Sequence, residues 1–186
     1  MSQFYITDTI IEGLKVIERV PLGDNRGFLA RIFCADQLKN VGWQKPIAQI
    51  NQTLTSKKGT VRGMHFQNPP HAEMKLVTCL QGEVWDVAVD LRKNSPTFLR
   101  WHAEKLSSEN CRALLIPEGF AHGFQTLSDQ CELLYLHTAP YVRELEGGIR
   151  PNDPSLGIKW PLDFSQISKR DAEQPLINKQ FQGVVI

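Results

Sequence analysis

One histidine in a strand-like run is the residue of this sequence best suited to proton transfer. The run TVRGMHFQ, at positions 60–67, places His65 close to Arg62. The ordinary pKa of imidazole lies near neutral pH, so a histidine can take up and release a proton during a reaction. Taken alone, His65 would more often be a structural histidine, so its neighbours must decide between the two interpretations.

Further polar residues occur in runs that also resemble strands or their ends. Lys75 follows in KLVTCL at 75–80, His122 lies in PEGFAHGF at 117–124, and Tyr135 and Tyr141 lie in ELLYLHTAPY at 132–141. A cation, a second imidazole and two phenols could serve one polar substrate. We therefore expect a lined pocket rather than one isolated histidine.

The bulk properties indicate an ordinary globular protein. The 186 residues are 41% hydrophobic and 22% charged, which favours a single domain over positions 1–186. The 21 Lys and Arg residues nearly balance 20 Asp and Glu residues, so no overall field favours nucleic acid or a membrane surface. An anionic ligand would have to meet a local basic cluster.

The start of the chain and the cysteines indicate a cytoplasmic protein. The first twenty residues, MSQFYITDTIIEGLKVIERV, lack the pattern of a secretory signal, and no apolar run is long enough to span a membrane. The four cysteines are widely separated and form no zinc or redox motif. We expect buried free thiols.

Short apolar and β-branched runs, separated by turn-forming segments, predict an all-β sandwich or barrel. Helix is expected only in minor pieces, at 35–40 and as a turn around 165–170. The expected strands are LKVIERV (14–20), GFLARIF (27–33), PIAQINQTL (46–54), KLVTCL (75–80), GEVWDVAVDL (82–91), FLRWHAEKL (98–106), RALLIP (112–117) and CELLYLHT (131–138).

Side chains alternate between the two faces of a strand, which indicates which residues share a face. In GEVWDVAVDL one face carries Trp85 and Val87 and is expected in the core, while the other carries Asp86 between small apolar residues and suits a barrel lumen. Arg62 and His65 would face oppositely in an ideal strand, so a bulge, a strand end or a dimer interface must reconcile them.

Eight motifs, in this order, resemble the dTDP-4-dehydrorhamnose 3,5-epimerase family, the RmlC-like cupin sugar-nucleotide epimerases. They are DNRGF (24–28), QINQT (49–53), GTVRGMHFQ (59–67), KLVTCLQGEVWDVAVDLRKNSPTF (75–98), LLIPEGFAHGF (114–124), YLHTAPY (135–141), NDPSLGIKWP (152–161) and SKRD (168–171).

The resemblance implies a cupin jelly-roll barrel and a homodimer in which the partner completes each site. It also implies epimerisation of a nucleotide-linked 4-keto-6-deoxyhexose at C3, C5 or both, without metal or organic cofactor. On matching positions, His65 would be the general base, Asp171 its partner, Tyr135 the acid, and Lys75 the group that steadies the enolate. The residues expected to hold the nucleotide sugar or frame the pocket are Arg26, Phe28, Gln49, Asn51, Arg62, His122 and Tyr141, together with Asp86 from its strand face.

Two positions depart from the family pattern, Arg31 and Pro151, of which Pro151 replaces an expected aromatic residue. Arg31 stands where the family usually carries a glutamate that accepts a hydrogen bond from thymine, and an arginine can only donate. The sequence therefore leaves open a CDP-linked or other 4-keto sugar as substrate. In the other interpretation, Arg31 turns to solvent or to a phosphate and base specificity is unchanged.

Two further alternatives remain from the residues alone. The chain could be a non-catalytic cupin that binds sugar nucleotides. It could also hold a metal, for which the candidate ligands are poorly spaced: His65, His71, Glu73 and His122. His102 and His137 have no role in the resemblance and are interpreted, with His71, as surface or packing residues.

Overall fold

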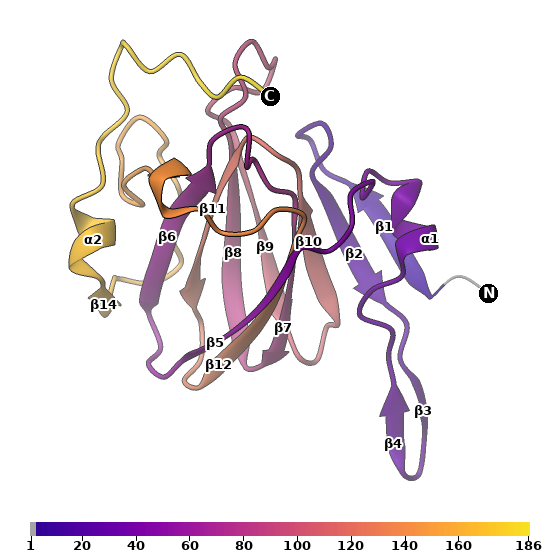
Figure 1. Cartoon of the computed structure of the whole chain (residues 1–186). Helices are drawn as coiled ribbons and strands as arrows, with labels where there is room; N and C mark the ends of the chain where they lie inside the picture. Colours follow the sequence, from indigo (N-terminus) through magenta and orange to yellow (C-terminus); the bar gives the residue numbers. More distant parts are fainter. Residues whose placement is uncertain (1–2) are drawn as a thin grey trace.

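The computed structural model describes residues 3–186, and most of its strands belong to two β-sheets (Figure 1). The first sheet has the strand order β1-β2-β10-β7-β12-β5. Its strands are β1 (Phe4–Asp8), β2 (Lys15–Arg19), β10 (Arg112–Ile116), β7 (Lys75–Gln81), β12 (Cys131–His137) and β5 (Gln49–Thr55).

The second sheet has the order β13-β6-β11-β8-β9, with β14 pairing in parallel with β6. Its strands are β13 (Glu146–Gly148), β6 (Thr60–Gln67), β11 (Phe120–Thr126), β8 (Glu83–Asp90), β9 (Trp101–Ser107) and β14 (Gln166–Ile167). All other pairs in both sheets are antiparallel. The all-β cupin fold expected from the sequence is confirmed.

A separate hairpin and three short helical segments complete the elements. The hairpin β3 (Leu22–Asp24) and β4 (Gly27–Leu29) projects away from the two sheets (Figure 1). The helices are α1 (Ala35–Lys39), the 3₁₀ turn η1 (Arg143–Leu145) and α2 (Lys169–Ala172). Within residues 3–186, no helix is long and apolar enough to cross a membrane.

The sequence located the central strands and misjudged some of the short ones. The strand expected over 27–33 ends at Leu29, and the turn expected around 165–170 contains β14 before α2 begins at Lys169. The strands β1, β3 and β13 were not expected. Most of these elements are short pieces whose conformation depends on a partner segment, so local pattern carries little signal for them.

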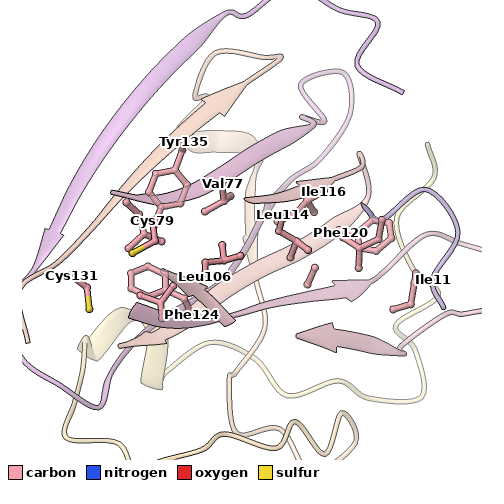
Figure 2. Close-up of a cluster of buried hydrophobic side chains, with 14 residues drawn as sticks. Ile11, Val77, Cys79, Leu106, Leu114, Ile116, Phe120, Phe124, Cys131 and Tyr135 are labelled. Atoms are coloured by element: carbon pink, nitrogen blue, oxygen red, sulfur yellow. The ribbon is translucent and has the colours of Figure 1, made fainter. Parts of the chain in front are cut away.

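The main core lies between the two sheets, because it combines side chains from both. Figure 2 shows Val77, Leu114 and Tyr135 of the first sheet together with Leu106 and Phe124 of the second. Val84 and Ala88 belong to this cluster, so the face of β8 that carries Asp86 points between the sheets, as the alternation predicted.

The opposite face of β8 is buried as well. Trp85, Val87 and Val89 pack in a second cluster with residues of the C-terminal segment, including Leu156 and Val184. This segment lies beside β6 and passes over one end of the strands in Figure 1, and its apolar side chains pack on this outer face of the second sheet. It continues into β14 and α2, so the packing that buries the outer face also fixes the position of residues 166–172 beside β6.

A bulge in β6 turns Arg62 and His65 to the same side. On β11 the partners of these residues are Phe124 and His122, so three steps on β6 oppose two on β11. The bulge lies beside Gly63, where a Cβ atom would stand 2.5 Å from the Cα atom of Gly123. Only glycine permits this approach of β6 to β11.

Candidate active site

A cavity of about 810 Å³ is lined by β6 and β11 of the second sheet, by β5, β7 and β12 of the first, and by the segment that contains α2. Eight of the residues proposed from the sequence line it: His65, Lys75, Tyr135, Asp171, Asn51, Arg62, His122 and Tyr141.

His65 and Asp171 form a close pair at the wall of this cavity. The Nε2 atom of His65 lies 2.7 Å from Oδ1 of Asp171, whose other oxygen accepts a hydrogen bond from the backbone N–H of Gly63 at 3.3 Å. Burial alone would raise the pKa of Asp171, but the hydrogen bonds from His65 and from the backbone of Gly63 hold it below its ordinary value. Asp171 is therefore a carboxylate, and Nε2–H of His65 donates to it. The Nδ1 atom of His65 keeps a lone pair and is the basic nitrogen.

The backbone around α2 explains why a distant aspartate reaches β6. Ser168 caps the helix by accepting a hydrogen bond from the backbone N–H of Asp171 at 3.1 Å. Two residues earlier, β14 pairs with Thr60 and Val61 at the start of β6. The Asp171 side chain is 4% exposed, so the pair is shielded from solvent on that side.

Arg170 adds a positive charge next to this pair. Its Nη2 atom lies 3.0 Å from Nε2 of His65, and Nη1 donates to Glu146 at 3.1 Å. A guanidinium can only donate, and Nε2 already carries the proton shared with Asp171, so the first contact is not a second hydrogen bond. Tyr141 donates to the same Glu146 at 3.0 Å.

Tyr135 enters the cavity from the first sheet, whereas His65 belongs to the second. Its ring is stacked on His137 at 6.1 Å and meets His122 edge-on at 6.0 Å. Burial raises the pKa of the Tyr135 hydroxyl above its usual value near 10, so it is a protonated donor at neutral pH.

Asp86 supports the site from behind. Its carboxylate is fully buried, does not line the cavity and lies 2.8 Å from Nε2 of His122, which does. The substrate contact proposed for Asp86 is therefore wrong for the chain as folded, because His122 stands between this carboxylate and the cavity.

Lys75, Glu73 and His137 form a cluster of charged or titratable side chains at the cavity. The Lys75 ammonium lies 3.1 Å from Glu73, and the second Glu73 oxygen lies 2.7 Å from Nδ1 of His137. Burial alone would raise the pKa of Glu73, but the hydrogen bond with His137 and the charge of Lys75 hold it below its ordinary value. His137, interpreted from the sequence as a surface or packing residue, is buried and lines the cavity.

Besides Asp86, four of the proposed binding residues lie away from the cavity of this chain: Arg26, Phe28, Arg31 and Gln49. Arg26 and Phe28 lie on the projecting hairpin, where the Arg26 side chain is 90% exposed and paired with Asp24. Arg31 is exposed just beyond that hairpin, and Gln49 is linked to the site by hydrogen bonds with Asn51 and with the backbone of Tyr141.

Sequence reasoning assigned no site role to His137, Glu146 or Arg170, and it named Glu73 only as a candidate metal ligand. A signal existed for His137, which shares a strand face with Tyr135 two residues earlier, and for Arg170, which precedes Asp171. No such signal marks Glu73 or Glu146.

Three of the four candidate metal ligands have other partners. His65 pairs with Asp171, Glu73 with Lys75 and His137, and His122 with Asp86. Within residues 3–186, no three His, Cys, Asp or Glu side chains form a group that could hold a metal ion. The four cysteines are free thiols, of which Cys79, Cys111 and Cys131 are buried.

Comparison with known proteins gives consistent matches. The sequence model of the dTDP-4-dehydrorhamnose 3,5-epimerase family matches residues 8–179. A dTDP-4-dehydrorhamnose 3,5-epimerase of Salmonella typhimurium is 43% identical over 94% of this chain and 96% of its own length. A dTDP-4-dehydrorhamnose 3-epimerase of Streptomyces niveus is 38% identical over 90% of this chain and 81% of its own.

The fold agrees with the sequence match. The crystal structure of a dTDP-6-deoxy-D-glucose-3,5-epimerase from Legionella pneumophila, in complex with dTDP-4-keto-L-rhamnose, superimposes with a TM-score of 0.91 at 40% identity. It covers 98% of this chain and 99% of that one. Since sequence and fold agree over nearly the whole length, the chain belongs to the dTDP-4-dehydrorhamnose 3,5-epimerase family, whose members are isomerases.

Proposed function

We propose that the protein inverts C3, C5 or both in a nucleotide-diphospho-4-keto-6-deoxyhexose of the dTDP-4-dehydro-6-deoxyglucose type. One observation carries the proposal. His65 of the second sheet, paired with the Asp171 carboxylate of α2, and the protonated Tyr135 of the first sheet line the same cavity. An inversion needs this arrangement, because the proton must leave one face of the sugar ring and arrive at the other.

The first step is proton abstraction by His65. A hydrogen on C3 or C5 is acidic because the electron pair left on carbon delocalises into the C4 carbonyl and forms an enolate. The Nδ1 atom of His65 takes the proton, and the Asp171 carboxylate stabilises the resulting imidazolium through Nε2–H. Lys75 places its ammonium where the enolate oxygen gains negative charge.

The second step is reprotonation from the opposite face. Tyr135 gives its hydroxyl proton to the carbon, and the enolate returns to the ketone. The His65 imidazolium then releases its proton to solvent, and the tyrosinate takes one up from solvent. Atoms and electrons balance without a redox partner, which supports the prediction that no cofactor is needed. Arg62 and His122 line the same cavity and are the groups proposed to hold the diphosphate.

The active form is proposed to be a homodimer. The projecting hairpin exposes Phe28 at 69% and Leu29 at 74%, and the edge strand β5 exposes Ile50 at 58% and Leu54 at 54%. Apolar side chains on a projecting hairpin and on a sheet edge favour a protein partner. A second copy that placed its hairpin against β5 would bring Arg26 and Phe28 to a cavity that Asn51 of β5 lines. Sedimentation at several protein concentrations tests this, and a monomer throughout would contradict it.

The base of the nucleotide is the least constrained part of the proposal. Arg31 can donate to an acceptor such as N3 of cytosine but cannot accept from thymine. Calorimetric titration with dTDP and with CDP decides between the two bases, and a clear preference for dTDP would reject the cytosine hypothesis. That residues 1–186 form one domain, and that the protein acts in the cytoplasm, stay predictions.

Deuterium exchange tests the reaction itself. In deuterated water the enzyme should place solvent deuterium at C3, C5 or both of dTDP-4-dehydro-6-deoxyglucose, or of its CDP analogue, and His65→Ala should abolish the exchange. Deuterium at C3 alone would indicate a 3-epimerase, the activity named for the Streptomyces niveus relative. Absence of exchange with every dTDP- and CDP-linked 4-keto sugar would leave the chain as a binding protein.

A further inference from the structure

A chain of hydrogen-bonding groups leads from the cavity edge to Lys75. The backbone N–H of Tyr141 donates to Oε1 of Gln49 at 2.9 Å, and Nε2 of Gln49 donates to Oδ1 of Asn51 at 3.2 Å. The Nδ2 atom of Asn51 then lies 3.5 Å from Nε2 of His137. From His137 the chain continues through Glu73 to the ammonium of Lys75.

The backbone N–H of Tyr141 fixes which group donates and which accepts at every step of this hydrogen-bond chain. Since the N–H of Tyr141 can only donate, Gln49 must present its oxygen there and its amide N–H to Asn51. Asn51 consequently turns its own N–H toward His137, whose Nε2 must accept with a lone pair. The proton of His137 therefore sits on Nδ1 and is donated to Glu73 at 2.7 Å, so this histidine is neutral.

The other end of the chain holds the Lys75 ammonium. It is paired with Glu73 at 3.1 Å and donates to the backbone carbonyl of His65 at 3.4 Å, and its side chain is only 8% exposed. These two partners leave one N–H of the ammonium for a ligand in the cavity. Glu73 can hold Lys75 in this direction only while its own carboxylate is held by His137.

The geometry points to His137 and Glu73 as positioning residues that aim the Lys75 ammonium at the developing enolate oxygen. This inference rests on the proposed function. A donor fixed in a buried site stabilises developing charge without reorganising during the reaction, which is the condition for large electrostatic catalysis. His137 would thus act on the rate through Glu73 and Lys75, without touching the sugar.

Variants at His137 separate positioning from packing. His137→Asn keeps an N–H near the place of Nδ1 and can still donate to Glu73, whereas His137→Gln extends its amide toward the place of Nε2, and His137→Ala removes both groups. With dTDP-4-dehydro-6-deoxyglucose, kcat should fall roughly 10- to 100-fold in His137→Ala and His137→Gln and recover most of its value in His137→Asn. KM and the Kd for dTDP should stay near their original values, because Arg62 and His122, the groups proposed to hold the diphosphate, are not part of this hydrogen-bond chain.

Glu73 supplies the second arm of the experiment. Glu73→Gln should lower kcat as much as His137→Ala, and the double variant should fall no further than the worse single variant, since both residues act through one ammonium. His102 and Glu104 also form a histidine–carboxylate pair, with 3.6 Å between Nε2 and Oε2, and neither residue lines the cavity. His102→Ala is therefore the matched control, and its kcat should be unchanged. An unchanged kcat in His137→Ala, a loss confined to KM, or additive effects in the double variant would each overturn the inference.

Nitrogen NMR tests the arrangement independently of turnover. In protein labelled with ¹⁵N at histidine, His137 should show a protonated Nδ1 and an unprotonated Nε2 at neutral pH, assigned by comparison with His137→Asn. A protonated Nε2 would overturn the inference even in an active enzyme. If the original protein shows the expected tautomer but exchanges no deuterium into any 4-keto sugar, the proposed function fails while the hydrogen-bond chain stands.

Discussion

The carboxylate of Asp171 lies 2.7 Å from the Nε2 atom of His65, although 106 positions separate the two residues in the chain. The contact depends on two local devices, the Ser168 cap that fixes α2 and the parallel pairing of β14 with β6. Because Nε2–H is committed to this carboxylate, the orientation and tautomer of the proposed base are set before a substrate arrives.

Replacing Asp171 with asparagine should lower kcat strongly with little change in dTDP binding. The amide preserves the volume but carries no charge to stabilise the imidazolium, so we expect a loss of roughly 10²-fold or more in deuterium exchange. Exchange rates by NMR and dTDP affinity by calorimetry measure the two quantities. Glu173→Gln, at an exposed position two residues further on, is the control and should leave both unchanged. A weaker dTDP affinity with normal exchange would contradict the assigned role.

Replacing Tyr135 with phenylalanine should separate exchange from inversion. His65 would still remove and return a proton on its own face of the sugar, whereas the donor on the other face is lost. Deuterium should therefore enter without inversion, and the ratio of exchange to inversion should rise at least roughly 10-fold. Product analysis by NMR gives both rates in one sample. Equal loss of both rates would show that Tyr135 serves binding or packing instead.

The architecture could be predicted from the sequence because its strands are short runs in which side chains alternate between two faces. Alternation in GEVWDVAVDL correctly separated the two faces of β8, and the opposed directions of Arg62 and His65 correctly required an irregularity, which is the bulge beside Gly63. Asp171 was found only through the family resemblance, since its own surroundings in SKRDAEQP read as an exposed helix start.

The features of the site that could not be predicted depend on contacts between distant segments. Such contacts leave no signal in the local sequence. Glu73 and His137 meet only because β7 and β12 are neighbours in the first sheet. Asp86 lies on the predicted face but is separated from the cavity by His122, whose position is set by β11. Arg26 and Phe28 project on the hairpin away from the cavity of this chain, so their proposed role depends on the proposed dimer.

Adding one methyl group at Gly63 should destabilise the fold and disable the site together. A Cβ atom there would lie 2.5 Å from the Gly123 backbone and 2.9 Å from the carbonyl of His122, at a φ of +124°. Gly63→Ala should therefore lower the free energy of unfolding by about 3 kcal/mol. Gly42→Ala is the matched control, because its φ of +116° is similar but its nearest neighbour is 3.6 Å away. Urea denaturation measures both, and equal losses would attribute the effect to backbone strain alone.

The buried Asp90 carboxylate should make stability depend on pH in the acid range. Burial alone would raise its pKa, but hydrogen bonds from Arg92, Ser95 and Thr97 hold it below its ordinary value. Since an unfolded aspartate titrates near about 3.9, this carboxylate stabilises the fold above that pH, and the contribution is lost as pH falls through the lower folded pKa. Asp90→Asn should therefore cost about 2 to 3 kcal/mol of unfolding free energy at pH 7, and the difference from the original protein should shrink below about pH 4. Asp8→Asn, at a side chain that is 80% exposed, should change stability by less than about 1 kcal/mol. Denaturant titrations at a series of pH values measure these differences, and a cost of Asp90→Asn that stayed constant down to pH 3 would show that its hydrogen bonds matter without its charge.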